Sequence, residues 1–277
     1  QPTSNLPRDK SSPQPETAND GERNLLSTKP VPVEKGAAEW TGNKYPNADG
    51  SYRQEDSHWV SPDGRVAVVA DGVGGNGGGA VASKITTDVF TERLPLLKDN
   101  ASQGEAEAWL KETIEQAAKV IKAAQIDGVY HPADGVGLIT TREMGSTVVA
   151  SVRLNDKMLL AWAGDSRAYL LRGGKLEQLT KDHSWENAVV DSGIMTLDQA
   201  QAQDKGHIIL SALGHDLKVG EAVTEIRLGD RFLLATDGLE SLEPSEIESV
   251  LVNSRPREAS SNLMEAVREK FEHVAGA

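Results

Sequence analysis

Three apolar strand segments, each followed at once by an aspartate, constrain the fold of this chain more than any other feature. The segments and their aspartates are 65–70 with Asp71, 158–164 with Asp165, and 231–236 with Asp237. Strands of this kind can gather their carboxylates at one edge of a sheet. Clustered carboxylates repel one another and resist ionisation, so a cluster of them favours a bound cation. Turn chemistry explains one aspartate after a strand, but it is a weaker explanation for three.

Composition indicates which cation and which partners the chain can bind. The chain has 277 residues and no cysteine, so neither disulfides nor thiolate zinc sites can form. Oxygen ligands without sulfur favour hard ions such as Mg²⁺ or Mn²⁺. The net charge of −13 disfavours nucleic acid and anionic membranes as partners. No run of 18 apolar residues occurs, and we expect no membrane insertion and a cytoplasmic protein.

The chain divides into a tail and one domain. Residues 1–36 hold six of the twelve prolines and few large apolar side chains. Such a segment cannot bury enough surface to offset its chain entropy, and we expect a disordered tail or linker. Residues 37–277 have the length and apolar content of a single globular domain with a substantial core.

Periodicity within this domain predicts an α+β fold. Turn pairs at Asn155-Asp156 and Gly173-Gly174 separate short apolar segments and predict antiparallel hairpins. The side chains of Leu110, Ile114 and Ile121 recur at helical spacing and predict a buried stripe. We expect strands at 38–41, 57–60, 65–70, 146–154, 157–164, 167–172, 175–179, 222–228 and 231–236. We expect helices at 79–97, 105–125, 185–192, 197–203, 244–253 and 259–273. Helices grouped around antiparallel hairpins are typical of α+β proteins.

A glycine-rich loop follows the first aspartate and admits two interpretations. Residues 72–77 match the pattern G-x-G-x-x-G, which also occurs in dinucleotide-binding folds. That fingerprint needs an acidic residue about 20 positions further on, at the end of a second strand. Here the candidates Asp88 and Glu92 fall inside the expected helix. The loop is better explained as a backbone that approaches an ion closely, so that the carbonyl of Gly72 can coordinate it.

Six segments in order resemble the metal-dependent protein serine/threonine phosphatases of the 2C family, in their bacterial form. The segments are Glu55-Asp56, 68–75 with Ala82-Ser83, 145–147, 163–167, 182–184 and 235–239. The resemblance extends over residues 38–277. It implies a four-layer αββα sandwich, in which two antiparallel β-sheets are flanked by helices. It also implies hydrolysis of phosphoserine and phosphothreonine in proteins, with a role in signalling.

The resemblance also implies a ligand set for two Mg²⁺ or Mn²⁺ ions. In it, Asp71 bridges both ions, Asp237 binds the first, and Glu55 and the carbonyl of Gly72 bind the second. Asp71 and Asp237 are the expected catalytic carboxylates, because two ions close together lower the pKa of a shared water. The resulting hydroxide would attack phosphorus in line.

Further roles follow from the same resemblance. Asp165 resembles the ligand of a weaker third ion, and Asp56 resembles an acid that orients ligand waters. Residues 185–216 would form a flap over the site. His183 is expected to be a structural hydrogen-bonding residue, because Asp-His-Ser is typical of a turn. We expect a monomer that acts on phosphorylated proteins, with a serine/threonine kinase as a functional partner.

Three departures from the family pattern leave an alternative open. Ser51 stands where the family has a phosphate-binding arginine, so Arg53 is the nearest candidate for that role. Val73 stands where eukaryotic members have a histidine. The family's last strand, with an Asp-Asn pair, is expected after the final helix, and no such pair precedes Ala277. The alternative is a catalytically impaired phosphatase-like domain that binds a phosphoprotein or another partner.

Overall fold

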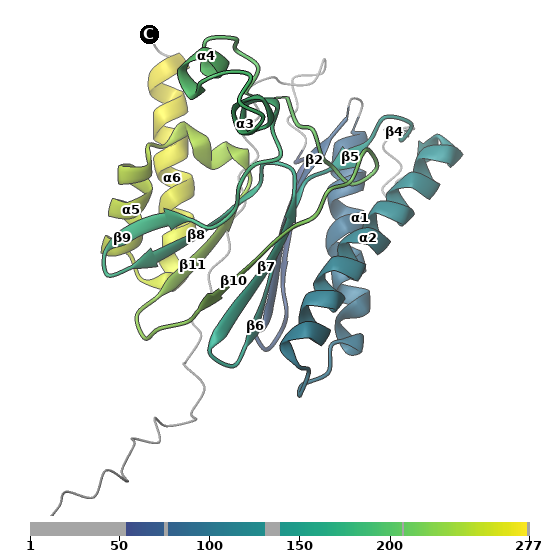
Figure 1. Ribbon diagram of the computed structural model, residues 1–277, viewed down its shortest axis with the longest axis horizontal. Coiled ribbons are helices and arrows are strands. Elements are labelled where there is room, and N and C mark those ends of the chain that lie inside the picture. The colour runs from purple at the N-terminus through teal and green to yellow at the C-terminus, as the bar shows by residue number, and fades with distance from the viewer. Residues whose placement is uncertain (1–53, 75–76, 131–138, 207, 276–277) are drawn as a thin grey trace, which may run out of the picture. The chain divides into compact units, whose positions relative to one another are not determined.

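The computed structural model describes residues 54–275 except 75–76, 131–138 and 207 (Figure 1). All described elements belong to the compact unit Val33–Ala277. The expected tail, the expected strand 38–41 and the candidate Arg53 lie outside the described residues. Within the described residues no helix combines the length and apolar character needed to cross a membrane.

Two antiparallel sheets form the centre of the domain. The first sheet has the order β1-β2-β6-β7-β10, and β5 pairs with β2 beside this path. Its strands are β1 (Asp56–Val60), β2 (Val66–Val73), β5 (Gly145–Ser146), β6 (Val148–Leu154), β7 (Lys157–Ala163) and β10 (Gly220–Glu225). The second sheet has the order β11-β8-β9, with β8 (Arg167–Arg172), β9 (Lys175–Gln178) and β11 (Arg231–Ala235). A separate short hairpin joins β3 (Val129–Tyr130) to β4 (Ile139–Thr140).

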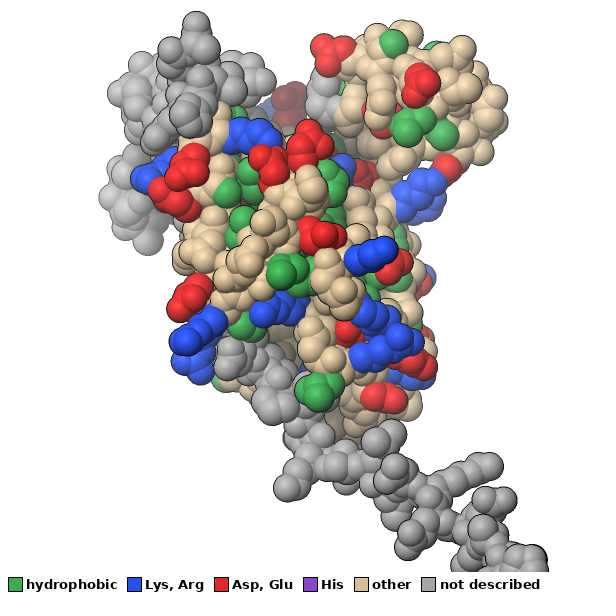
Figure 2. Space-filling view, turned by 90° about the vertical axis from the view of Figure 1, so that its left-hand side faces the viewer, with side chains coloured by type: hydrophobic (Ala, Val, Ile, Leu, Met, Phe, Trp, Pro, Cys, Tyr) green, Lys and Arg blue, Asp and Glu red, His purple; other side chains and the backbone are tan. Residues whose placement is uncertain are grey.

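Helices cover the outer faces of both sheets (Figure 1). The helices α1 (Gly78–Arg93) and α2 (Gln103–Asp127) cover the first sheet, and η1 (Leu94–Leu96) follows α1. The helices α5 (Pro244–Asn253) and α6 (Pro256–Ala275) cover the second sheet. Two short helices, α3 (Trp185–Asp191) and α4 (Leu197–Gln201), lie within the predicted flap, and η2 (Asp237–Ser241) follows β11. The face with α5, α6 and β9 shows acidic and basic side chains intermixed (Figure 2).

Three hydrophobic clusters correspond to the three interfaces between these four layers. Val68, Phe90 and Ile114 belong to the cluster between the first sheet and α1 and α2. Trp162, with its neighbours in β6 and β8, belongs to the cluster between the two sheets. Leu251 belongs to the cluster between the second sheet and α5 and α6. The prediction of an α+β, four-layer αββα sandwich is therefore confirmed.

The longest described helix, α2, shows how local sequence places an element. Its first turn is capped by Ser102, whose side chain accepts a hydrogen bond from the Glu105 N–H, while the Glu105 carboxylate accepts one from the Ser102 N–H. The predicted stripe, including Ile114 and Ile121, is buried against the first sheet. Helix α2 therefore forms the outer wall behind the strands that carry the site.

Alternation along β2 decides which way its aspartate faces. Val66, Val68 and Ala70 are buried, and the first two pack in the cluster beneath α1 and α2. Val69 packs in the cluster between the sheets. Because alternate side chains of a strand share a face, Asp71 faces the second sheet like Val69. The first sheet thus presents Asp71 to the strand that leads to Asp237.

Candidate active site

The aspartates after the three apolar segments meet at the junction of the two sheets. The carboxyl groups of Asp71 and Asp237 lie close enough to interact directly, and Asp165 interacts electrostatically with both. The β8–β11 register ends with the pair Arg167 and Ala235, and each of these residues is two positions from an aspartate, Asp165 or Asp237. Asp56 lies opposite Asp71 in the β1–β2 ladder. Acidic side chains from both sheets therefore converge at one place.

The expectation that these aspartates end strands at one edge of a single sheet is wrong in two respects. Asp71 lies inside β2, because the strand continues through Val73 and pairs there with β5. Asp237 comes from the second sheet, whereas Asp71 and Asp165 come from the first. The sequence pattern alone could not separate the two sheets, since both supply apolar strands of similar length.

Burial and mutual repulsion make these carboxyl groups weak acids. Loss of hydration, followed by the negative charges of Asp56 and Asp237, raises the pKa of Asp71 to about 10. Loss of hydration, followed by the charge of Asp237, raises the pKa of Asp165 to about 6. Within the described chain, no three acidic or histidine side chains are arranged to hold an ion as they stand. A cation reverses this electrostatic balance, since its charge attracts carboxylates that otherwise repel.

These shifts predict how metal-free protein responds to pH. Between about pH 7 and pH 9, Asp71 is ionised in the unfolded chain and protonated in the folded one, so folding takes up a proton. The free energy of unfolding of metal-free protein should therefore fall with rising pH, by up to about 1.4 kcal/mol per pH unit. Urea titrations at several pH values in chelator test this. A free energy of unfolding that rises across this window would contradict the assigned state of Asp71.

Buried hydroxyl groups fix the backbone around the aspartates. The Asp71 N–H donates to Thr147 Oγ1 at 3.0 Å, and the Thr147 N–H donates to the Asp71 carbonyl at 2.8 Å. Thr147 Oγ1 and Ser166 Oγ also share a hydrogen bond of 2.6 Å. Both hydroxyl side chains are fully buried, so they connect β2 to the residue after Asp165 without contact with solvent. Gly164, at φ +101°, packs against Thr147, where a Cβ would lie 2.8 Å from its side chain.

Two glycines bring the backbone close to Glu55. The Gly72 N–H donates to the Glu55 carbonyl at 3.0 Å. A Cβ on Gly79 would lie 2.5 Å from the Gly72 carbonyl oxygen and 3.1 Å from Glu55 Cδ. The Glu55 carboxyl group therefore lies beside Gly79, at the point where the two glycine backbones touch. This supports the interpretation of the glycine loop as a close backbone approach.

Asp56 is held by the segment that carries Asp237. The Thr236 hydroxyl donates to Asp56 Oδ2 at 3.2 Å. Thr236 lies two positions after Leu234, which packs between the sheets. Because alternate residues of an extended segment share a face, the Thr236 side chain also faces the first sheet. This contact links β1 with the turn after β11. Sequence reasoning did not single out Thr236, although its position directly before Asp237 could have suggested a supporting role.

His183 has the structural role predicted for it. Its Nδ1 accepts a hydrogen bond from the Gly164 N–H at 3.3 Å, and its ring stacks on Trp162 with centroids 6.1 Å apart. Burial and the nearby charge of Lys218 lower the pKa of His183, which favours the neutral ring that this hydrogen bond requires. The backbone of His183, just before the predicted flap, also pairs with a residue inside the flap, because the Leu210 N–H donates to the His183 carbonyl at 2.7 Å.

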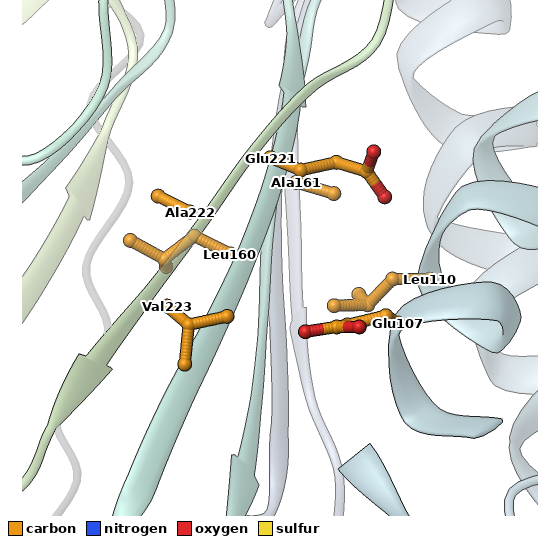
Figure 3. A pocket seen from close by; sticks show the side chains of 7 residues that line it. All are labelled: Glu107, Leu110, Leu160, Ala161, Glu221, Ala222 and Val223. Atoms are coloured by element: carbon orange, nitrogen blue, oxygen red, sulfur yellow. The ribbon is translucent and has the colours of Figure 1, made fainter. Parts of the chain in front are cut away.

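A separate hollow of about 300 Å³ opens between α2 and β10 (Figure 3). Leu110, Leu160 and Val223 supply apolar lining, and Glu107 and Glu221 supply carboxylates. It contains none of the converging aspartates and no basic group that could hold a phosphate. The aspartates at the junction of the sheets, rather than this hollow, are therefore the candidate active site.

Comparison with known proteins identifies the family to which this fold belongs. The profile of the family described as protein phosphatase 2C matches residues 44–273. The chain belongs to this family. Its sheets are antiparallel throughout the described strands, which also excludes the parallel arrangement of a dinucleotide-binding fold for them. As a member of the family it is a protein serine/threonine phosphatase that acts on phosphorylated proteins and depends on divalent metal ions.

Individual relatives agree with this assignment. The chain is 32% identical over 197 residues to the serine/threonine phosphatase stp of Listeria monocytogenes, covering 69% of this chain and 73% of that one. It is 32% identical over 203 residues to the serine/threonine protein phosphatase PstP of Mycobacterium tuberculosis, covering 73% of this chain and 36% of that one. These comparisons give no support to the alternative of an impaired phosphatase-like binding module.

Solved structures show the same fold. The Mycobacterium tuberculosis phosphatase PstP/Ppp superposes with a TM-score of 0.66 at 30% identity, over 79% of this chain and 87% of that one. The catalytic domain of PstP in complex with two manganese ions superposes with a TM-score of 0.64 at 28% identity. That superposition covers 86% of this chain and 89% of the PstP domain.

Proposed function

We propose that the converging carboxylates are the metal ligands of this phosphatase. In this proposal Asp71 would be a ligand of both ions, Asp237 would hold the first, and Glu55 with the Gly72 carbonyl would hold the second. The observation that carries it is the close approach of the Asp71 and Asp237 carboxyl groups, which come from different sheets and raise each other's cost of ionisation enough to raise the pKa of Asp71. Groups of this kind bind Mn²⁺ or Mg²⁺ through oxygen.

Two local features support the fit of these residues to metal ions. Asp165 is only 8% exposed, and its Oδ1 has no hydrogen-bond partner among the described residues. A buried carboxylate oxygen without a partner is costly, and a cation would satisfy it. The second feature is the close approach of Gly72 and Gly79 beside Glu55, which a Cβ on either glycine would fill. We assign Asp165 to a third ion and propose Mn²⁺ as the preferred metal.

Each residue of the candidate site has its own proposed role in the hydrolysis. Bound divalent ions lower the pKa of a water molecule and offset charge on the phosphoryl oxygens. The carboxylates of Asp71 and Asp237 would hold the ions in place. Thr147 and Ser166 fix the backbone that carries Asp71, through hydrogen bonds from Asp71 N–H to Thr147 and between the two hydroxyl groups. Asp56, held by Thr236, orients water at the rim of the site. Phosphate binding by Arg53, a kinase partner, a monomeric state and a cytoplasmic location stay predictions.

A metal-depletion experiment tests the proposed function. Protein stripped with chelator should hydrolyse a phosphothreonine peptide slowly, and added Mn²⁺ should restore turnover with saturation. The same peptide carrying phosphotyrosine serves as the control for substrate class. Full activity in chelator would overturn the metal assignment. Mn²⁺ binding without turnover on any phosphoserine or phosphothreonine peptide would instead revive the binding-module alternative.

A further inference from the structure

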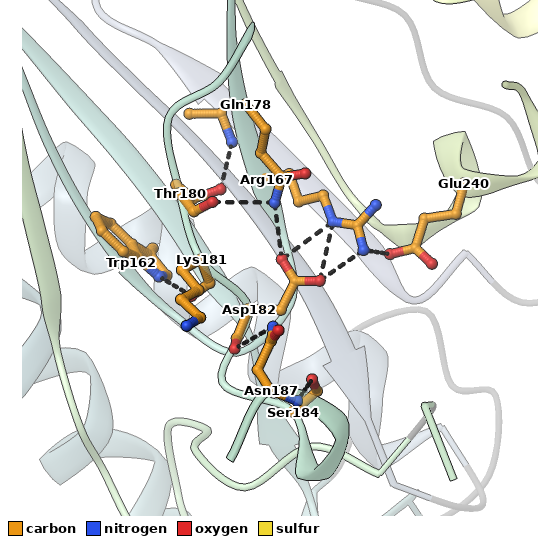
Figure 4. Close-up of polar contacts among 10 residues, drawn as sticks. Trp162, Arg167, Gln178, Thr180, Lys181, Asp182, Ser184, Asn187 and Glu240 are labelled. Atoms are coloured by element: carbon orange, nitrogen blue, oxygen red, sulfur yellow. Dashed lines mark hydrogen bonds and ion pairs between the residues drawn. The ribbon is translucent and has the colours of Figure 1, made fainter. Parts of the chain in front are cut away.

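One arginine connects three segments around the candidate site. Arg167 is the first residue of β8, two positions after Asp165. It lies opposite Ala235, which is two positions before Asp237. Its side chain reaches Asp182, one residue before His183, and also Glu240 in η2 (Figure 4).

Arg167 contacts both carboxylates through the Nε–Nη2 edge of its guanidinium group. Nε lies 3.0 Å from both carboxylate oxygens of Asp182, and Nη2 lies 2.5 Å from Asp182 Oδ2. Nη2 also lies 2.7 Å from Glu240 Oε1. A planar fork can contact two carboxylates at once in fixed directions, whereas a lysine ammonium is a single point of charge. Arg167 therefore fixes Asp182 and Glu240 relative to each other.

Asp182 anchors the start of the flap. Its Oδ1 also accepts a hydrogen bond from Gln178 at 3.1 Å, and its carbonyl accepts one from the Asn187 side chain in α3 at 3.0 Å. The flap segment, residues 185–216, begins three positions later. Within the flap, the Trp185 N–H donates to the Ile208 carbonyl at 2.9 Å. This hydrogen bond joins the start of α3 to the segment that follows α4. A displacement of Asp182 would therefore move the base of the flap.

Glu240 anchors the segment that carries Asp237. Both residues belong to η2, in which residues three apart lie one above the other. The Glu240 side chain is 41% exposed, and the nearest acidic groups repel it. Without the guanidinium, repulsion from Asp237 and Asp165 would turn Glu240 and its helical turn outward. The Arg167–Glu240 contact thus holds the turn of Asp237 toward Asp165.

We propose that Arg167 is a positioning residue that couples the flap to the metal site. The inference rests on the proposed function, because it takes Asp237 and Asp165 as metal ligands. Through Glu240 the guanidinium sets the direction of Asp237, and through Asp182 it sets the base of the flap. Coupling between two sites is reciprocal, so metal binding orders the flap and an ordered flap strengthens metal binding.

The test compares Arg167→Lys with a matched control at the other end of the same strand. Arg172 makes the same kind of fork with Asp230, with Nε–Oδ1 at 3.0 Å and Nη2–Oδ2 at 2.6 Å. Its side chain is 30% exposed, close to the 23% of Arg167. Arg172→Lys should therefore cost similar stability without a change at the metal site. Both variants are measured by Mn²⁺ calorimetry, by hydrogen exchange of residues 185–206, and by phosphopeptide kinetics.

In the wild type, Mn²⁺ should slow hydrogen exchange across the flap. In Arg167→Lys, the Mn²⁺ dissociation constant should rise about tenfold, as expected for loss of a charge-assisted contact. Mn²⁺ should then no longer protect residues 185–206, and KM should rise more than kcat falls once metal is saturating. Arg172→Lys should behave like the wild type in all three measurements.

The following results would contradict the proposed coupling between the flap and the metal site. Wild-type behaviour of Arg167→Lys in calorimetry and exchange would overturn it, and so would equal losses in Arg172→Lys. If Arg167→Lys fails to fold, Glu240→Gln replaces it, and unchanged Mn²⁺ affinity with unchanged flap protection in that variant would overturn the coupling. Failure of the proposed function itself looks different, because the wild type would then not bind Mn²⁺.

Discussion

Replacement of Asp71 by Asn should abolish phosphatase activity while making the metal-free protein more stable. Asp71 is the proposed bridge between two ions, and an amide removes its negative charge without a change in size. Several kcal/mol of transition-state stabilisation depend on such ions, so kcat/KM should fall at least about 10³-fold. In chelator the melting temperature should rise, because folding at neutral pH no longer requires protonation of a carboxyl group whose pKa burial raises to about 10.

Two controls make this prediction specific. Asp88→Asn removes an equivalent charge from the exposed face of α1, where Asp88 pairs with Lys84, and should leave kinetics and Mn²⁺ binding unchanged. Differential scanning fluorimetry with and without Mn²⁺ should show a stabilising shift in the wild type and none in Asp71→Asn. An Asp71→Asn enzyme with wild-type turnover at saturating Mn²⁺ would refute the bridging role. The expected combination, lower activity with higher stability, is the signature of a site built at the expense of stability.

Local sequence rules explain which parts of the fold could be predicted. The bounds of β8 (Arg167–Arg172) and α5 (Pro244–Asn253) agree with the sequence prediction to the residue. Both are bordered by strong local signals, a Gly-Gly turn with positive φ at Gly173 and Gly174, and a proline in the first helical turn. Helix α6 begins at Pro256 rather than at the expected residue 259, because proline fits the first helical turn, where its missing N–H has no partner to lose.

Features that depend on long-range packing could not be predicted in this way. Periodicity shows that a strand is buried, but not which of two sheets it joins, so the origin of Asp237 in the second sheet was missed. The roles of Thr147 and Glu240 were missed for the same reason. Thr147 contacts Asp71 across 76 residues of chain, and Glu240 contacts Arg167 from a separate element. The spacing of three positions between Asp237 and Glu240 was a local signal that the two side chains could lie on the same face of a helical turn.

Substitution of Gly72 by Ala should damage stability and metal binding together. The new Cβ would lie 2.0 Å from the carbonyl oxygen of Gly79, 2.2 Å from its carbonyl carbon and 2.7 Å from the carbonyl oxygen of Glu55. These are backbone atoms of the first turn of α1 and of the segment before β1, so no side chain can turn aside to relieve the contact. Overpacking of this kind costs about 1–3 kcal/mol or more, and here it separates β2 from α1.

The position of the clash decides its functional consequence. Because the Glu55 carboxyl group and the Gly72 carbonyl lie at this contact, a shift of α1 away from β2 would separate two proposed ligands of the second ion. We therefore expect Gly72→Ala to lower the melting temperature in chelator and to weaken Mn²⁺ binding in calorimetry. Gly104→Ala is the matched control, because a Cβ at Gly104 in α2 meets nothing within 4 Å and alanine favours helix. Gly104→Ala should be neutral or stabilising by about 0.5–1 kcal/mol. Equal effects of the two substitutions would show that the Gly72–Gly79 contact does not set the geometry of the site.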